Sequence, residues 1–226
     1  MSKRAFDLAL AVPAMVAAVP LIAIAAVAIR LTSPGPVFYR ATRVGRGNRP
    51  FTMFKLRTMH VNWSGASRKL ADSAITARND PRVFRVGSIL RSTKLDELPQ
   101  LFNVLRGEMS LVGPRPEDPR FVEKHYTPEH LATLDVPPGL TSPGSVWYYA
   151  SAESELTADD PERHYVERVL PLKLALDLVY VRGISVWYDV ALIARTVRVL
   201  GALLLGRRRF ADPPEMPAAR QLLVSQ

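Results

Sequence analysis

The chain has 226 residues, of which 48% are hydrophobic and 23% charged, so it can bury a core and wholesale disorder is excluded. The absence of cysteine excludes disulfides, thiolate metal sites and a cysteine nucleophile, and it fits a reducing compartment. The net charge of +9 is uneven, because residues 1–71 hold 11 of the 30 cations and one of the 21 acids, which indicates a local anionic partner such as phospholipid, nucleotide or nucleic acid.

A segment of 22 residues without a charge runs from Leu8 to Ile29. Roughly 20 apolar residues suffice to cross a bilayer, and the length of this segment argues against a cleaved signal peptide. Pro20 near its middle removes a backbone hydrogen bond, and basic residues, which are enriched on cytoplasmic flanks, occur at both ends. We therefore expect residues 1–32 to form a re-entrant membrane helix that is broken at Pro20. A kinked spanning helix is the alternative.

The rest of the chain, residues 33–209, is expected to form one helix-rich α/β (α+β) domain. Strand-like segments at 37–44 and 51–57, joined by a Gly-Asn turn signal, predict a small β-hairpin. Helices are expected at 86–91, from Asp96 to Leu105, after Thr127-Pro128, at 161–182 and at 187–205. The aromatic segment 145–149 predicts a short strand, and the Pro- and Ala-rich tail at 210–226 is expected to be disordered.

The predicted helix at 187–205 is apolar with interleaved Arg195 and Arg198, and three further arginines follow it. This pattern is typical of an amphipathic helix that lies on an anionic membrane surface. A core helix with a cationic last turn is the alternative. The sequence thus predicts one domain attached to a phospholipid membrane.

Two adjacent carboxylates, Asp96 and Glu97, precede a predicted helix. Asp is a preferred N-cap and Glu suits a first turn, so a structural role as a helix cap is one interpretation. In the functional interpretation, Asp96 is a nucleophile that attacks phosphorus and forms an acyl phosphate. Arg91 and Lys94 lie close enough along the chain to screen the approach of two anions. A Mg²⁺ ion would take oxygens from Asp96 and Glu97 together with substrate phosphates.

Three further cations are candidates for binding phosphate. Arg115 lies between Pro114 and Pro116, so it sits on a stiff loop suited to bidentate phosphate binding; a rigid turn with a solvated arginine is the alternative. Lys55 and Arg57 alternate with apolar residues on a predicted strand and should share a face. That face is either part of the site or the wet side of a sheet.

Other function classes find little support in the sequence. The four histidines show no metal-ligand spacing, and neither a Gly-x-Gly-x-x-Gly motif nor a Gly-Lys-Ser/Thr phosphate loop occurs. The arginine-rich segment 40–57 would suit nucleic acid, but the long apolar segment beside it favours lipid headgroups and pyrophosphates. No nucleic-acid partner is expected.

Six motifs follow one another in the first half of the chain: Lys3-Arg4-Ala5-Phe6-Asp7, Ser33-Pro34-Gly35-Pro36-Val37-Phe38, Phe54-Lys55-Leu56-Arg57-Thr58-Met59, Asp80-Pro81-Arg82, Leu95-Asp96-Glu97-Leu98-Pro99-Gln100-Leu101 and Met109-Ser110-Leu111-Val112-Gly113-Pro114-Arg115-Pro116. With these residues the chain resembles the bacterial sugar transferase family, the small monotopic phosphoglycosyl transferases. The resemblance resumes at Leu176-Asp177-Leu178-Val179-Tyr180 and Ser185-Val186-Trp187-Tyr188-Asp189.

The resemblance implies a specific activity. A sugar-1-phosphate passes from a nucleotide diphosphate sugar, expected to be a UDP-sugar, to a polyprenyl phosphate such as undecaprenyl phosphate, which initiates exopolysaccharide, O-antigen or glycan synthesis. Asp96 is then the nucleophile that forms a covalent sugar-phosphoryl enzyme, Arg91 and Arg115 lie around the phosphates, and Mg²⁺ is required. The resemblance also implies a cytoplasmic catalytic domain at 33–209 on the bacterial inner membrane. Whether the chain forms a homodimer is left open by the sequence.

The sequence departs from the family pattern at three places. Val19 precedes Pro20 where relatives have Ser, and Ala41 stands where they usually have Gln. The segment 140–149 lacks the Asn and Arg expected there, and that Arg is implied to contact the donor. A catalytically impaired membrane scaffold in a polysaccharide assembly complex is therefore the alternative function.

An active enzyme would have to replace the missing arginine. We expect Arg163 or Arg168 to reach the donor phosphates, and the aromatic cluster of Trp147, Tyr148 and Tyr149 to shape donor choice. The alternative is that both arginines pair with acidic neighbours on a solvated helix.

Overall fold

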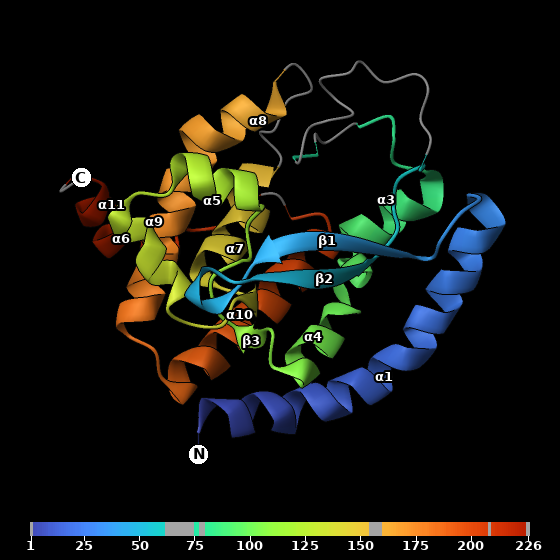
Figure 1. Ribbon diagram of the computed structural model, residues 1–226, viewed down its shortest axis with the longest axis horizontal. Helices are drawn as coiled ribbons and strands as arrows, with labels where there is room; N and C mark the ends of the chain where they lie inside the picture. Colours follow the sequence, from blue (N-terminus) through green and yellow to red (C-terminus); the bar gives the residue numbers. More distant parts are fainter. Residues whose placement is uncertain (1, 62–74, 77–79, 154–159, 208, 225–226) are drawn as a thin grey trace.

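Helix α1 (Lys3–Thr32) runs along the lower and right-hand edge of the molecule in Figure 1. The computed structural model describes residues 2–61, 75–76, 80–153, 160–207 and 209–224. Ser2 caps α1 by accepting a hydrogen bond from the backbone N–H of Ala5. By length and composition α1 is apolar enough to cross a membrane.

The break expected at Pro20 is not present. Pro13 and Pro20 both lie inside α1, which continues past them and curves in Figure 1. Both prolines are on exposed parts of the helix, where the lost hydrogen bond bends the backbone without ending it. The buried side of α1 instead carries small residues at seven-residue intervals, Ala11, Ala18 and Ala25. This spacing lets the helix approach the rest of the molecule closely.

The described residues form two small sheets of two strands each. Strands β1 (Phe38–Val44) and β2 (Pro50–Leu56) form the expected antiparallel hairpin, in which Ala41 pairs with Met53. Strands β3 (Ser110–Val112) and β4 (Gly139–Thr141) are parallel. Just after β3, the backbones of Gly113 and Gly139 approach so closely that a Cβ on Gly139 would lie 2.1 Å from the Gly113 nitrogen. This contact fixes where the following proline-rich loop leaves the sheet.

The remaining elements are helices and helical turns. The longer helices are α3 (Arg85–Ser92), α4 (Gln100–Arg106), α5 (Pro119–His125), α9 (Leu170–Arg182), α10 (Val186–Leu204) and α11 (Met216–Val224). The shorter ones are α6 (Pro128–Leu131), α7 (Pro143–Trp147) and α8 (Pro161–His164). The helices expected at 86–91, after Thr127, at 161–182 and at 187–205 are confirmed, as is the stop at Gly107, which has a left-handed backbone.

Two further expectations are wrong. The segment 145–149 is helical: Ser142 accepts a hydrogen bond from the Ser145 N–H and Pro143 takes the first helical position, so a helix-start signal overrides the β-propensity of the aromatic residues. The tail at 210–226, expected to be disordered, contains α11. Met216 and Ala219 are buried against Ala175 and Leu176 of α9, because the tail repeats its apolar residues at helical spacing.

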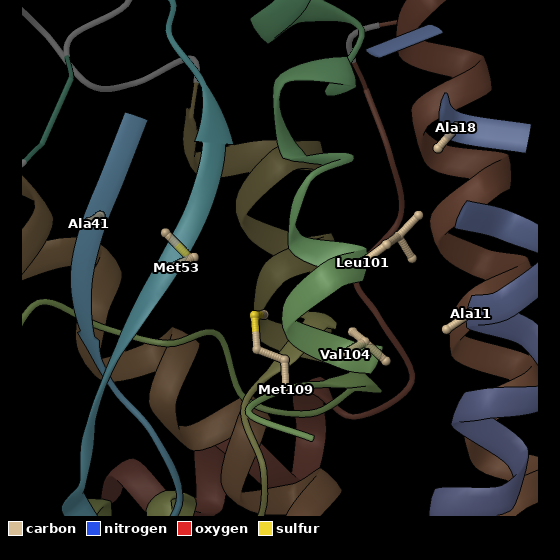
Figure 2. Close-up of a cluster of buried hydrophobic side chains, with 7 residues drawn as sticks. All are labelled: Ala11, Ala18, Ala41, Met53, Leu101, Val104 and Met109. Carbon is tan, nitrogen blue, oxygen red and sulfur yellow. The ribbon is translucent and has the colours of Figure 1, made fainter. Parts of the chain in front are cut away.

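One hydrophobic cluster joins the hairpin to α1 through α4 (Figure 2). Leu101 and Val104 of α4 lie between Met53 of β2 and Ala11 and Ala18 of α1. Because α4 is wedged between these elements, the turn that leads into it is held in a defined position. That turn carries the two adjacent carboxylates.

Candidate active site

Asp96 and Glu97 lie in a 3₁₀ turn, Leu95–Glu97, between α3 and α4. Lys94 precedes it with a left-handed backbone (φ 56°), which reverses the chain sharply. The N-cap residue of α4 is Pro99, and no side chain caps that helix. The interpretation of Asp96 as a helix cap is therefore wrong.

The side chain of Asp96 is buried and incompletely bonded. It is 7% exposed, and its Oδ1 is buried without a hydrogen-bond partner among the described residues. Burial raises the pKa of Asp96, while the nearby charges of Lys55, Arg91 and Lys94 oppose that rise. A buried polar atom without a partner costs roughly 1–3 kcal/mol, so the exceptions in a native protein call for an explanation. A ligand that approaches Oδ1 would supply one.

Glu97, in contrast, is fully engaged by two cations. Arg115 donates from Nη2 to Oε1 at 2.5 Å and from Nη1 to Oε2 at 3.2 Å, and Lys55 donates to Oε1 at 2.9 Å. Burial disfavours the charged carboxylate, but Arg115 and Lys55 outweigh it and hold the pKa of Glu97 well below its usual range. The fork of Arg115 is thereby fixed on the carboxylate of Glu97.

Two more cations complete the cluster. Lys94 Nζ donates to both oxygens of Glu153, at 2.7 and 3.0 Å, and lies 4.0 Å from the ring centroid of Tyr149. The guanidinium of Arg91 makes no hydrogen bond or ion pair with any residue the structure describes, while its charge acts on Asp96. Among the residues that the structure describes, Arg91 is thus the cation of this cluster whose guanidinium is left to bind an anion.

A buried polar group behind the site holds the loop that carries Arg115. Glu117, two residues later, accepts hydrogen bonds from Lys173 and, at 2.6 Å, from the Tyr165 hydroxyl. Asp177 accepts from the backbone N–H of Gly144 at 3.0 Å and from that of Arg115. Sequence reasoning assigned these residues no role, although a lone Lys and a lone Asp in the apolar run 170–178 could have signalled buried partners.

The model of the bacterial sugar transferase family matches residues 1–202. The chain belongs to the bacterial sugar transferase family. The resemblance inferred from the motifs is thereby confirmed. The sequence is similar to undecaprenyl-phosphate glucose phosphotransferase of Komagataeibacter xylinus (40% identity over 203 residues, 88% of this chain and 35% of the relative). This chain therefore spans about a third of that relative's length.

Two other family members match over more of their own length. UDP-glucose:undecaprenyl-phosphate glucose-1-phosphate transferase of Caulobacter vibrioides is 39% identical over 198 residues, which are 86% of this chain and 68% of the relative. The exopolysaccharide production protein PSS of Rhizobium leguminosarum bv. phaseoli is 34% identical over 200 residues, 86% of this chain and 92% of the relative.

The structure of this sugar transferase family member brings Asp96, Glu97, Lys55 and Arg115 together, but not Arg57. Arg57 follows the end of β2, and its guanidinium donates to the Ser33 hydroxyl, the Ser33 carbonyl and the Pro36 carbonyl. Because these bonds occupy all three of its nitrogens, Arg57 fastens the end of α1 to the hairpin. The expectation that Arg57 lies beside Lys55 in the phosphate site is therefore wrong.

The arginines expected to replace the missing donor contact lie on the surface. Arg163 pairs with Glu167 at 2.8 Å, with 72% of its side chain exposed, and Arg168 is also exposed. For Arg163 the alternative interpretation is therefore correct, because the residue forms an ion pair on a solvated helix. Of the aromatic residues, Tyr149 lies against the cluster, with Arg115 5.6 Å from its ring centroid.

Neither a ready-made metal centre nor a cavity identifies the site. No group of three or more His, Cys, Asp or Glu side chains in the described part of the chain could hold a metal ion. A cavity of about 360 Å³ lies between α7, α10 and the residues 207 and 210–214, and its lining does not include Asp96 or Glu97. The unpartnered oxygen of Asp96 among cations is the feature that marks the site.

Proposed function

We propose that this chain transfers a sugar-1-phosphate from a UDP-sugar to undecaprenyl phosphate and so initiates exopolysaccharide or related glycan synthesis. The names of the relatives, which specify UDP-glucose or UDP-N-acetylgalactosamine with undecaprenyl phosphate, support the substrate class. The observation that carries the proposal is the buried Oδ1 of Asp96, which lacks a partner among the described residues, as does the guanidinium of Arg91, whose charge acts on it. A nucleophile needs such an unengaged oxygen, and an anionic substrate needs the cation.

The reaction proceeds in two displacements at one phosphorus atom. An oxygen of Asp96 first forms a bond to the sugar-bearing phosphorus of the donor, the bridging P–O bond breaks, and the nucleoside monophosphate leaves with the electron pair. A phosphate oxygen of undecaprenyl phosphate then attacks the same phosphorus. The bond to Asp96 breaks, and the carboxylate is regenerated.

The cations have separate tasks in this scheme. Arg91 binds the diphosphate of the donor. Arg115 has five N–H donors, of which two are directed at Glu97, so the others remain for phosphoryl oxygens. Glu97 orients Arg115 and Lys55 rather than attacking. Burial raises the pKa of Asp96, and the charges of Lys55, Arg91 and Lys94 favour its ionised, nucleophilic form against that rise.

A magnesium ion would take its ligands at this site partly from the protein and partly from the substrate. Mg²⁺ is commonly held by one or two carboxylates plus substrate phosphates, and Asp96 has an oxygen free for it, whereas both Glu97 oxygens already accept from cations. When bound, Mg²⁺ would neutralise charge on the diphosphate.

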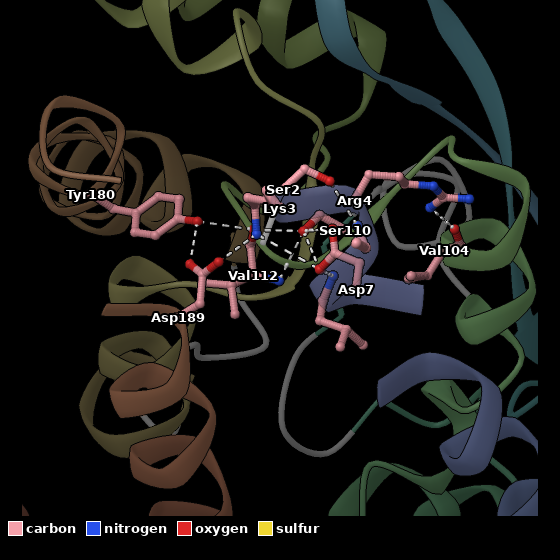
Figure 3. Close-up of polar contacts among 11 residues, drawn as sticks. Ser2, Lys3, Arg4, Asp7, Val104, Ser110, Val112, Tyr180 and Asp189 are labelled. Carbon is pink, nitrogen blue, oxygen red and sulfur yellow. Dashed lines mark hydrogen bonds and ion pairs between the residues drawn. The ribbon is translucent and has the colours of Figure 1, made fainter. Parts of the chain in front are cut away.

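The two ends of α1 support a re-entrant arrangement on the cytoplasmic side of the inner membrane. At its start, Lys3 bonds to Asp189 of α10 at 2.7 Å and Arg4 donates to two carbonyls of α4 (Figure 3). At its end, Ser33 accepts a hydrogen bond from Arg57 at 2.7 Å. A spanning helix would have to hold these ends on opposite sides of a bilayer. Both ends instead contact the same domain.

Exposed apolar residues of α10 support the expectation that this helix lies on the membrane surface. Trp187 near its start is 83% exposed, and Leu205 just after its end is 89% exposed. Aromatic and leucine side chains next to arginines suit the headgroup region.

The activity is tested with purified protein in detergent or nanodiscs, undecaprenyl phosphate, Mg²⁺ and a panel of UDP-sugars. We expect release of UMP with at least one donor and none from the Asp96→Asn variant. A folded wild-type protein that releases no UMP with any donor would contradict the proposal. That result would favour the alternative function, a membrane scaffold, which the altered segment 140–149 supports.

The topology is tested by introducing Ser2→Cys or Leu31→Cys into this cysteine-free chain. Both cysteines should resist a membrane-impermeant thiol reagent in intact cells and react after lysis. Leu31 is 82% exposed, so its cysteine is accessible once the membrane is open. Labelling of position 2 from outside the cell would demonstrate a spanning helix.

A further inference from the structure

The buried polar atoms that lack a partner concentrate at one place. In the described part of the chain they are Asp96 Oδ1, Gln100 Nε2, the Tyr149 hydroxyl and His164 Nε2. Gln100 lies one helical turn after Asp96, so two of the four belong to the carboxylate turn and the start of α4. Tyr149 comes from a distant part of the sequence, on the π-helical turn Tyr148–Ala152.

Contacts of the aromatic ring place Tyr149 in the same cluster. Lys94 Nζ lies 4.0 Å and Arg115 Cζ 5.6 Å from its ring centroid. Lys94 directly precedes the carboxylate turn, and Arg115 is bonded to Glu97. A cation over an aromatic ring interacts with the π face, whereas the hydroxyl lies in the plane of the ring. The two cations therefore hold the ring without using its O–H.

The hydroxyl itself is buried without being satisfied. Tyr149 is 8% exposed, and its oxygen is inaccessible to solvent and has no hydrogen-bond partner among the described residues. Buried Tyr hydroxyls usually find a partner, since leaving one unpaired costs free energy. Tyr165 illustrates the ordinary case, because its buried hydroxyl donates to Glu117 at 2.6 Å.

We propose that the Tyr149 hydroxyl is a substrate-binding group that donates a hydrogen bond to a phosphoryl oxygen of the nucleotide diphosphate donor. The inference deepens the proposed function and rests on it. The neighbouring cations attract the anionic diphosphate to the side chain, and the hydrogen bond is charge-assisted because the acceptor is anionic. The donor thereby satisfies the hydroxyl that the free protein leaves unpaired.

Tyr149→Phe removes only the hydroxyl, and Tyr165→Phe is its matched control. We measure thermal unfolding without substrate, and the binding of UDP and UDP-glucose by calorimetry in the Asp96→Asn background, where turnover does not interfere. Tyr149→Phe should leave the melting temperature unchanged or raise it, and should weaken binding about tenfold, or about 1.4 kcal/mol. Tyr165→Phe should lower the melting temperature, because the Glu117 carboxylate loses a buried donor.

Three results would overturn the proposal: unchanged affinity of Tyr149→Phe for both nucleotides, a loss of thermal stability as large as that of Tyr165→Phe, or no binding of either nucleotide to the parent protein. The second would mean that the hydroxyl has a partner within the protein. If the parent protein binds UDP-glucose and Tyr149→Phe weakens it, but wild type releases no UMP, the proposed transfer fails while the contact stands.

Discussion

Two groups of buried carboxylates in this protein are bonded in opposite ways. One group is the anchor network of Lys3, Asp7, Ser110, Tyr180 and Asp189, in which both carboxylates, Asp7 and Asp189, accept hydrogen bonds from protein donors (Figure 3). Asp7 accepts from the Ser110 hydroxyl at 2.9 and 3.0 Å, and Asp189 accepts from Lys3 and from the Tyr180 hydroxyl, each at 2.7 Å. In the candidate active site, Asp96 keeps an oxygen without a donor among the described residues.

Burial alone does not distinguish the two groups, since Asp189 is 0% and Asp96 7% exposed. What differs is whether the protein itself satisfies the carboxylate. A carboxylate with all its donors contributes to stability and resists chemistry, because an attack on phosphorus would cost those bonds. A carboxylate held among cations but left partly unbonded is destabilising in the free protein and available to a substrate.

The largest effect that tests this contrast is expected for Asp96→Asn. Transfer should fall by at least about 10³-fold, because an amide is no substitute for the nucleophilic carboxylate. The free energy of unfolding should stay equal or rise, since the variant removes a buried charge with an unpartnered oxygen. Turnover is measured as UMP release and stability by chemical denaturation. Substantial turnover by a folded variant would refute the covalent mechanism.

The opposite result is expected for the anchor network. Asp189→Ala should lower the free energy of unfolding by about 3–5 kcal/mol, because Lys3 and Tyr180 lose a buried acceptor. The folded fraction should keep the KM of the wild type for the donor. Asp212→Asn is the matched control, since Asp212 pairs with Arg220 on the surface and its loss should be nearly neutral. An equal loss of the free energy of unfolding in both variants would contradict the view that the anchor network stabilises the fold more than a surface ion pair does.

Asp177 is intermediate between the two kinds of carboxylate. It accepts hydrogen bonds, but burial still raises its pKa from 3.8 to about 6. The folded protein therefore binds a proton that the unfolded chain has lost, and stability falls as pH rises from about 4 to about 6. Two pKa units correspond to about 3 kcal/mol. Asp177→Asn should remove this part of the pH dependence, so the stability difference between variant and wild type should change by that amount between pH 4 and pH 7. Parallel curves would contradict the assignment.

The smallest effect is expected on the surface. Arg163→Ala should change the donor KM by less than threefold and leave the melting temperature within one degree, because the pair with Glu167 is exposed and solvent screens it. Arg91→Ala is the contrasting variant, whose free guanidinium is proposed to bind the donor. A larger rise in KM for Arg163→Ala than for Arg91→Ala would restore Arg163 to the site.

Local patterns in the sequence were sufficient for the elements that depend on neighbours in the chain. The apolar segment predicted α1, the Gly-Asn signal predicted the β1–β2 turn, and the pairing of Asp96 with Glu97 in a motif of its family predicted the site. The same reasoning failed at Pro20 and in the tail, where packing against α4 and α9 decides whether a helix persists. A periodic pattern indicates a face but not what covers it.

The sequence by itself determined the family, the carboxylate pair and the cations available to it. Only the tertiary structure decided their roles, because the contacts join residues far apart in the chain: Lys55 meets Glu97 across 42 positions, while Arg57, two residues further, turns to Ser33. Which buried groups obtain a partner depends on such long-range contacts. That is why Asp96 and Tyr149, which lack a partner among the described residues, could not be distinguished from the bonded Asp7 and Asp189 by the sequence alone.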